Sequence, residues 1–383
     1  MRTVIILGTG ATIGSGYTKC EKRLPGDRNF FKNQAVKNLI SQYPALEIML
    51  RFFRKESGDD LDGVGLEEVW TFLEFCSKGV YKEIYDLKKE KEEWRNLIRH
   101  PDSERGDEHC GCKKFRKDQT IPAALDEIDL ALLAGWDLRR LLNEIYGCIS
   151  SPSENIYQRF LKKFNIPSDN TTTFISLNYD TVLEHALDQV NTPDHSSWFY
   201  AHVQTDVPRD PKGIQIQVLK PHGSLNWLFE GNEPSVSIST DYQLDPVQNR
   251  SFKTNIFEQA MIVLPTQLKQ ELNIESTQDK VTTDLFTKIW KSMADVLAEA
   301  NRVFIIGYSF PSTDHHFRTL MRQVNIKRKC KEYKEVYCCT SAKMGEMEEQ
   351  FLAEQTIKNA RLLFPTLLSN FHDCKGGFNF FVQ

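Results

Sequence analysis

The sequence predicts an α/β protein with a Rossmann-like, doubly wound parallel sheet, interrupted by a large helical insertion. Two observations carry this prediction. Short apolar, β-branched runs alternate with segments of helical periodicity, which is typical of parallel sheets whose strands are joined by helices. Between the first two of these runs, over residues 28–163, helical periodicity replaces the strand pattern.

The amino-terminal part is expected to begin with a strand. Residues 3–7 are apolar or β-branched and lead directly into a glycine-rich segment. In the insertion, helical periodicity is clearest over residues 65–75, 125–134 and 138–146. The charged, turn-rich residues 101–119 are expected to form an exposed loop between these helices.

After the insertion, strand and helix patterns alternate regularly. Strands are expected at residues 172–176, 214–219, 261–264, 303–306 and 336–339, and helices at 181–190, 285–300, 313–324 and 346–362. Ser312 or Thr313 is expected to cap the 313–324 helix. Residues 191–211 and 231–254 lack clear periodicity and are expected to be loops.

These patterns divide the chain into three parts. We assign residues 1–27 and 164–340 to the Rossmann-like domain, 28–163 to the helical insertion, and 341–383 to a carboxyl-terminal helix and tail.

The composition is that of an ordinary globular protein. Of 383 residues, 40% are hydrophobic and 26% charged, and the net charge of −4 gives no sign of nucleic-acid binding. No apolar run reaches the roughly 20 residues that a membrane helix needs. The nine cysteines, odd in number and irregularly spaced, favour a reducing cytoplasm over a disulfide framework.

Four segments are candidates for one active site: residues 8–16, 177–180, 220–224 and 307–309. Each follows a predicted strand. Parallel sheets bind ligands at the carboxyl ends of their strands, so these segments are expected to meet there. Their glycines, amide, carboxylate and imidazole suit a nucleotide and a polar reaction.

The first segment is expected to bind a diphosphate. Gly8 and Gly10 allow a tight turn and close backbone approach, and a following helix would supply free N–H groups. The pattern departs from G-x-G-x-x-G, and the acidic residue typical of dehydrogenases has no clear counterpart. The alternative is a structural turn that needs glycine.

The second segment places Asn178 and Asp180 on the same side of the chain. An amide can donate and accept together, so Asn178 could hold a ribose hydroxyl or a water. Asp180 could bind an amide group or orient a neighbour. Its alternative role is an Asx turn that caps the helix beginning near Thr181.

His222 is the candidate general base. It lies on a predicted turn between Pro221 and Gly223, a setting that argues against burial as a packing residue. An imidazole can accept or give up a proton near neutral pH. His315 and His316, in the first turn of a predicted helix, are expected to have structural or ligand-contacting roles.

No metal site is expected. His109, Cys110 and Cys112 are close in sequence, but a closed zinc site needs four ligands and no second cysteine pair lies nearby.

The four segments resemble, in order, the motifs of the sirtuin family: a glycine loop G-A-G-A-S followed by S-G, then T-Q-N-I-D, H-G and G-T-S. The matching stretches here are residues 8–12 with 15–16, 176–180, 222–223 and 307–309. Protein-deacylating sirtuins carry a four-cysteine zinc module after H-G, and this chain has none there. Residues 305–314 resemble instead the bacterial sirtuin-like proteins that destroy NAD in anti-phage defence.

The resemblance implies a role for each matching residue. Gly8, Gly10, Thr12 and Ser15 would line the NAD diphosphate, Ser309 would lie towards the adenosine, and Gly307 would also contact the cofactor. Asp180 would contact the nicotinamide carboxamide. Asn178 and His222 would act at the nicotinamide ribose, where the glycosidic bond breaks.

The activity implied is that of an NAD⁺ glycohydrolase, with NAD⁺ as substrate and no metal. Such an activity is toxic, so a homo-oligomer that rests inactive until infection is expected, paired in this branch of the family with a HerA-type hexameric ATPase. Two alternatives stay open. One is an NAD-dependent protein deacylase or ADP-ribosyltransferase, and the other is a non-catalytic module that senses NAD or ADP-ribose.

Overall fold

The computed structural model describes residues 1–15, 30–57, 61, 64–77, 127–146, 155–166, 171–190, 198–203, 216–229, 236–238, 260–262, 277–311, 314–329, 331–340 and 347–382. The chain forms two compact units. The larger comprises residues 1–23, 148–243 and 255–383, and the smaller comprises 24–147 and 244–254. In the described ranges, no helix is long and apolar enough to cross a membrane.

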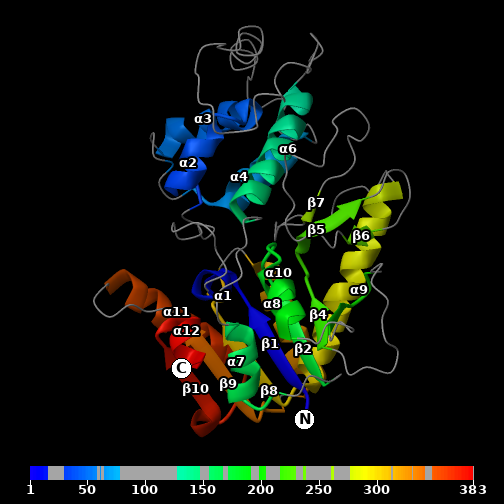
Figure 1. Cartoon of the computed structure of the whole chain (residues 1–383), viewed down its shortest axis with the longest axis vertical. Coiled ribbons are helices and arrows are strands. Elements are labelled where there is room, and N and C mark those ends of the chain that lie inside the picture. The colour runs from blue at the N-terminus through cyan, green and yellow to red at the C-terminus, as the bar shows by residue number, and fades with distance from the viewer. Residues whose placement is uncertain are drawn as a thin grey trace. The chain divides into compact units, whose positions relative to one another are not determined.

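The larger unit is organised around a parallel sheet (Figure 1). Its described strands lie in the order β10-β9-β8-β1-β2-β4-β3, and every neighbouring pair is parallel. The strands are β1 (Thr3–Leu7), β2 (Thr172–Ser176), β3 (Trp198–Tyr200), β4 (Ile216–Leu219), β8 (Arg302–Ile306), β9 (Glu335–Thr340) and β10 (Phe371–Lys375). The strand order reverses at β1, the type of position where doubly wound sheets bind ligands.

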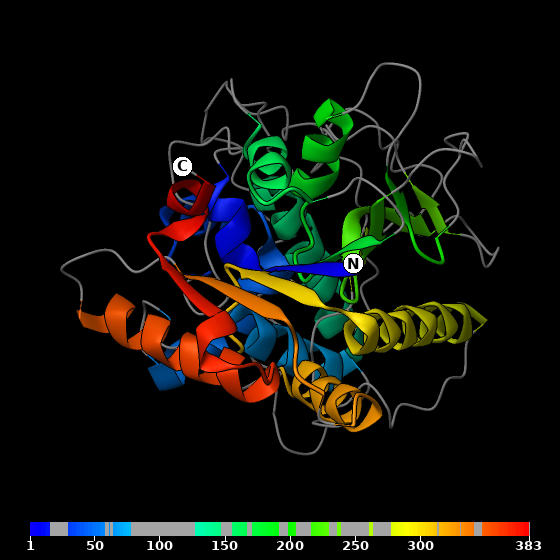
Figure 2. The ribbon, with the colours of Figure 1, turned by 90° about the horizontal axis from the view of Figure 1, so that it is seen from below.

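Helices cover both faces of this sheet, as Figure 2 shows. One face carries α9 (Thr277–Glu299), α10 (His315–Lys327) and α11 (Met347–Leu363). The other carries α1 (Thr9–Gly14), α7 (Ile156–Lys163), α8 (Val182–Val190) and α12 (Gly377–Val382). All five residues of β1 and of β2 are buried, which is why, apart from Ser176, these strands consist of apolar or β-branched residues. The predicted Rossmann-like α/β class is confirmed.

A small antiparallel sheet accompanies the main one. It has the order β6-β5-β7, formed by Val236–Ile238, Gly223–Phe229 and Ala260–Ile262. β7 lies where a strand was expected, but it pairs with β5 and stays outside the parallel sheet. β6 lies in the stretch 231–254, which was expected to be a loop.

The carboxyl-terminal segment completes the main sheet. Beyond α11, β10 pairs with β9 and α12 covers the sheet face. Phe381 of α12 stacks at a tilt on Phe164, with ring centroids 4.8 Å apart, and Phe378 meets Phe160 at 5.8 Å. Residues 347–382 therefore belong to the layers of the sheet, where the sequence suggested a helix and tail.

The smaller unit is helical in its described part, with α2 (Gln34–Ile40), α3 (Pro44–Ser57), α4 (Leu66–Ser77) and α6 (Glu127–Tyr146). α6 packs on the other three. It runs continuously through the two helical stretches that the sequence separated at residues 125–134 and 138–146. α7 lies in the stretch assigned to the insertion, but its residues Tyr157 and Phe160 are buried in the core of the larger unit.

Candidate active site

The four predicted segments come together at one edge of the sheet. They follow β1, β2, β4 and β8, which are consecutive in the order β8-β1-β2-β4. Because these strands are parallel, their carboxyl ends lie at the same edge, and the predicted meeting of the four segments is confirmed.

The glycine loop turns directly from β1 into α1. Gly8 is the N-cap of this helix, and Thr12 is buried within it. The N–H groups of Gly8 and Gly10 donate to the carbonyls of Ile306 and Gly307, at 3.0 Å each. Both amides are thus engaged by the end of β8, and neither is one of the free N–H groups that the sequence suggested.

Close backbone packing also explains why glycines occupy this edge of the sheet. A Cβ at Gly8 would lie 2.5 Å from the carbonyl oxygen of Gly307, and one at Gly10 would lie 2.8 Å from its Cα. Gly307 itself has φ +64°, and a Cβ there would lie 2.1 Å from the backbone nitrogen of Ala11. The loops after β1 and β8 approach this closely because all three positions lack a side chain.

The polar groups of the glycine loop and the β2 loop bond to one another. Asn178 donates through Nδ2 to the carbonyl of Gly8 at 2.9 Å and to Thr12 Oγ1 at 3.0 Å. Thr12 in turn donates to Asp180 Oδ2 at 2.7 Å. Asn178 and Asp180 are buried, with 7% and 5% of their surface exposed. The expectation that they lie on the same side of the loop agrees with this shared partner.

Asp180 also forms the Asx turn that the sequence left open. Its Oδ1 accepts from the backbone N–H of Val182 at 3.0 Å, at the start of α8. Burial raises the pKa of this carboxyl above its usual value, and the nearby Lys220 ammonium and the hydrogen bond from Thr12 oppose that rise only in part.

His222 is buried, with 3% of its surface exposed, which corrects the expectation that it is not packed. It occupies a turn in which the N–H of Gly223 donates to the carbonyl of Lys220 at 3.1 Å, with Gly223 at φ +79°. Its ring lies 6.4 Å from that of Tyr179 and 5.9 Å from that of Trp290. The local turn is as predicted, and these two rings from elsewhere in the chain enclose the imidazole.

The segment after β8 combines an exposed serine with a buried tyrosine. Ser309 is exposed at this edge, whereas Tyr308 donates from its hydroxyl to Asp314 Oδ2 at 2.5 Å. Asp314 caps α10 by accepting from the N–H of Phe317 at 3.0 Å. The cap was expected at Ser312 or Thr313. This expectation is wrong, because the carboxylate one or two residues later accepts the free N–H, and both expected residues lie outside the described part.

Ser15, the last residue expected at the diphosphate, is the C-cap of α1 and bonds back to that helix. Its hydroxyl donates to the carbonyl of Thr12 at 2.6 Å, and 4% of its surface is exposed.

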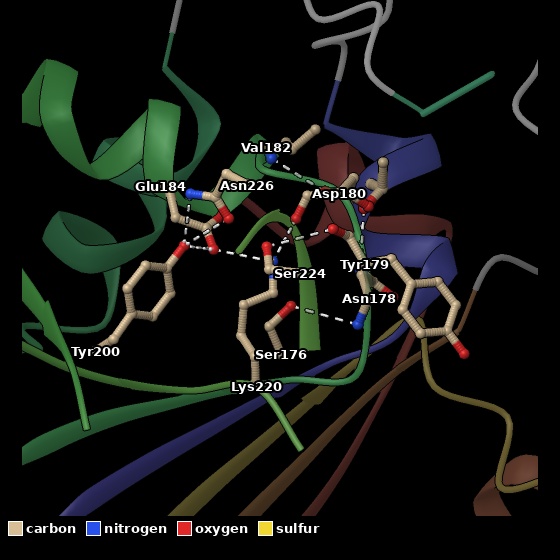
Figure 3. Close-up of polar contacts among 11 residues, drawn as sticks. Ser176, Asn178, Tyr179, Asp180, Val182, Glu184, Tyr200, Lys220, Ser224 and Asn226 are labelled. Atoms are coloured by element: carbon tan, nitrogen blue, oxygen red, sulfur yellow. Dashed lines mark hydrogen bonds and ion pairs between the residues drawn. The ribbon is translucent and has the colours of Figure 1, made fainter. Parts of the chain in front are cut away.

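Sequence reasoning missed a buried polar cluster beneath these loops (Figure 3). Lys220, Glu184, Ser224 and Asn226 are each wholly buried, and so is the phenol of Tyr200. Glu184 belongs to α8, Tyr200 to β3, Lys220 to the β4–β5 connection, and Ser224 and Asn226 to β5. One sequence feature pointed to this cluster: Lys220 directly follows a predicted strand and precedes Pro221 and His222. Lysines are usually exposed to solvent, so its burial could not be inferred from this position.

The metal expectation concerns residues that the structure does not describe. Cys110 and Cys112 lie outside the described ranges, and within those ranges no three His, Cys, Asp or Glu side chains lie together in an arrangement suited to a metal.

A match to a known protein family includes three of the four segments at this edge of the sheet. Residues 172–360 match the model of the SIR2-like domain. The match covers about half of the chain, from β2 to α11, and supports a relationship to the sirtuin-like proteins. No curated protein matches the chain significantly. The SIR2-like match fits an NAD-related function and indicates an NAD-dependent enzyme, and it contains Asn178, His222 and Ser309. β1 and its glycine loop precede the matched residues but lie between β2 and β8 in the sheet.

Proposed function

We propose that this chain is an NAD⁺ glycohydrolase. Water would attack the anomeric carbon of the nicotinamide ribose, and the bond from that carbon to the nicotinamide nitrogen would break. The products are nicotinamide, ADP-ribose and one proton. The cleavage would pass through an oxocarbenium-like state, as glycoside cleavage does.

One observation carries the proposal: Asn178 and His222 follow the adjacent strands β2 and β4, at the edge where the glycine loop meets β8. His222 would take the proton from the attacking water or from a ribose hydroxyl. The Nδ2 group of Asn178 donates to the Gly8 carbonyl and to Thr12 Oγ1, which supports a role in which its side-chain oxygen would accept from that water. The enclosing rings of Tyr179 and Trp290 would limit competing solvent.

The other predicted residues would shape the nucleotide site. The amides of Gly8 and Gly10 already serve β8, so these glycines would act by letting the diphosphate approach the backbone closely. Thr12 and Ser15 would fix the loop, and Asp180 would contact the carboxamide. Gly307 and the exposed Ser309 would lie towards the adenosine.

The biological role that we propose is depletion of cytoplasmic NAD⁺ in anti-phage defence. A toxic hydrolase requires a resting state, so the proposal includes an inactive homo-oligomer switched on by infection. A HerA-type hexameric ATPase is the proposed partner.

The test is the incubation of purified protein with NAD⁺, alone, with nucleic acid and with the ATPase partner, with separation of the products by chromatography and mass spectrometry. The proposal predicts nicotinamide and free ADP-ribose in equal amounts. ADP-ribose attached covalently to a protein acceptor would identify a transferase, and acyl-ADP-ribose formed only with an acylated protein would identify a deacylase. Tight NAD⁺ binding without any product under every condition would identify a sensor.

A further inference from the structure

The Lys220 side chain is fully buried and fully bonded. None of it is exposed, and its ammonium contacts three acceptors: the carbonyl of Asp180 at 2.5 Å, Ser224 Oγ at 2.7 Å and Glu184 Oε1 at 2.9 Å. An ammonium has three N–H donors, so each one has a partner.

Two of these acceptors belong to the two loops that carry the proposed chemistry. Asp180 lies in the loop between β2 and α8, two residues after Asn178, and Ser224 lies two residues after His222 (Figure 3). The same loops are joined by the N–H of Leu225, which donates to the carbonyl of Tyr179 at 2.9 Å. Lys220 is therefore a cross-link between the β2 loop and the turn that holds His222.

Glu184 supports this cross-link from α8. Its Oε1 accepts from Lys220 and also from the hydroxyl of Tyr200, at 2.6 Å, and Asn226 donates to that hydroxyl at 3.2 Å. The two charged side chains are wholly buried. A buried ion pair is weak grounds for a stabilising role, because apolar residues of similar volume often stabilise a fold equally well. An apolar side chain, however, could not bind the Asp180 carbonyl and the Ser224 hydroxyl together.

We propose that Lys220 is a positioning residue that holds Asn178 and His222 in register with each other, with Glu184 as its counter-ion. The inference rests on the proposed function for its catalytic consequence. Its structural part, the fixing of two loops by one ammonium, is independent of turnover.

The experiment compares three variants. Lys220→Met leaves Glu184 charged and buried, so a large fall in melting temperature is expected. The double variant Lys220→Met/Glu184→Gln removes both charges, which should recover most of that fall. Lys327→Met is the control, because it breaks the exposed ion pair with Asp295, where the nitrogen–oxygen distance is 2.6 Å, on a helix surface.

Two readouts separate positioning from stability. Hydrogen exchange measured by mass spectrometry should become at least about tenfold faster in peptides covering residues 176–183 and 220–227 of the double variant, with little change elsewhere. Its turnover number for NAD⁺ should fall about tenfold to a hundredfold with little change in KM, because the reacting groups are misplaced while binding persists. The control should match the wild type in both.

Wild-type exchange and turnover in the double variant would overturn the proposal and leave Lys220 as a mere counter-charge. Faster exchange in both peptides, with a wild type that never consumes NAD⁺, would support the positioning role and refute the proposed function. Should the double variant not fold, Ser224→Ala provides the same test, since it removes one acceptor and keeps the ion pair. Unchanged exchange in that variant would also overturn the proposal.

Discussion

Gly307→Ala should destabilise the larger unit strongly, without any ligand. A non-glycine residue at φ +64° costs about 1–2 kcal/mol. The new Cβ would lie 2.1 Å from the backbone nitrogen of Ala11, so the loops must separate by more than about 1 Å. Separation also strains the bond from the Gly10 N–H to the Gly307 carbonyl, which contributes about 1 kcal/mol. Together these effects give a loss of about 3 kcal/mol or more in the free energy of unfolding.

Urea unfolding followed by circular dichroism measures this loss. Gly135→Ala is the matched control, because it makes the same chemical change within α6, where a Cβ would meet nothing within 4 Å. There the higher helix propensity of alanine should stabilise the smaller unit by about 1 kcal/mol. A loss below about 1 kcal/mol for Gly307→Ala would refute the packing argument. If that variant kept its stability and lost only its response to NAD⁺, the glycine would serve ligand approach alone.

Two further predictions concern the helical unit and the nucleotide. Asp137 accepts from the N–H groups of Ala45 and Leu46 at the start of α3, and burial raises its pKa to about 6. The contribution of Asp137 to the free energy of unfolding is complete below the unfolded pKa of about 4 and falls as the pH rises through 6. Asp137→Asn should therefore remove this pH dependence, and Asp137→Ala should be about 1 kcal/mol less stable than Asp137→Asn at every pH. Urea unfolding at pH 4.5 and 7.5 checks both, and identical pH dependence in wild type and Asp137→Asn would contradict the assignment. NAD⁺ or ADP-ribose at 100 times its dissociation constant should stabilise the wild type by about 2.7 kcal/mol, measured as a rise in melting temperature, and no rise at millimolar ligand would contradict the nucleotide site.

The sequence predicts the central strands well because each is buried on both faces. β1 and β2 match the expected residues 3–7 and 172–176, since a strand covered on both sides is mostly apolar or β-branched, as both are except at Ser176. The edge strands escaped prediction. Among the described strands β10 pairs only with β9, and its residues His372, Asp373 and Lys375 are at least partly exposed, so no apolar pattern marks it.

The candidate site likewise has features that the sequence predicts and features that depend on contacts between distant residues. Its loops could be placed because parallel strands end at one edge, a rule that needs only the strand assignments. The burial of His222 could not be predicted, because its neighbour Trp290 comes from α9, far along the chain. Lys220 was missed for a similar reason: its partners Glu184 and Ser224 come from α8 and β5, and only the fold brings them together.

The most direct test of the proposed function is the rate of NAD⁺ loss for wild type and His222→Ala under conditions that activate the wild type. Because His222 is buried, the melting temperature and its rise with ADP-ribose must be measured on the same samples. The account predicts that His222→Ala still binds ADP-ribose but loses NAD⁺ about 10²–10⁴-fold more slowly, the usual effect of removing a general base. A folded, ligand-binding His222→Ala that hydrolyses NAD⁺ at the wild-type rate would contradict it.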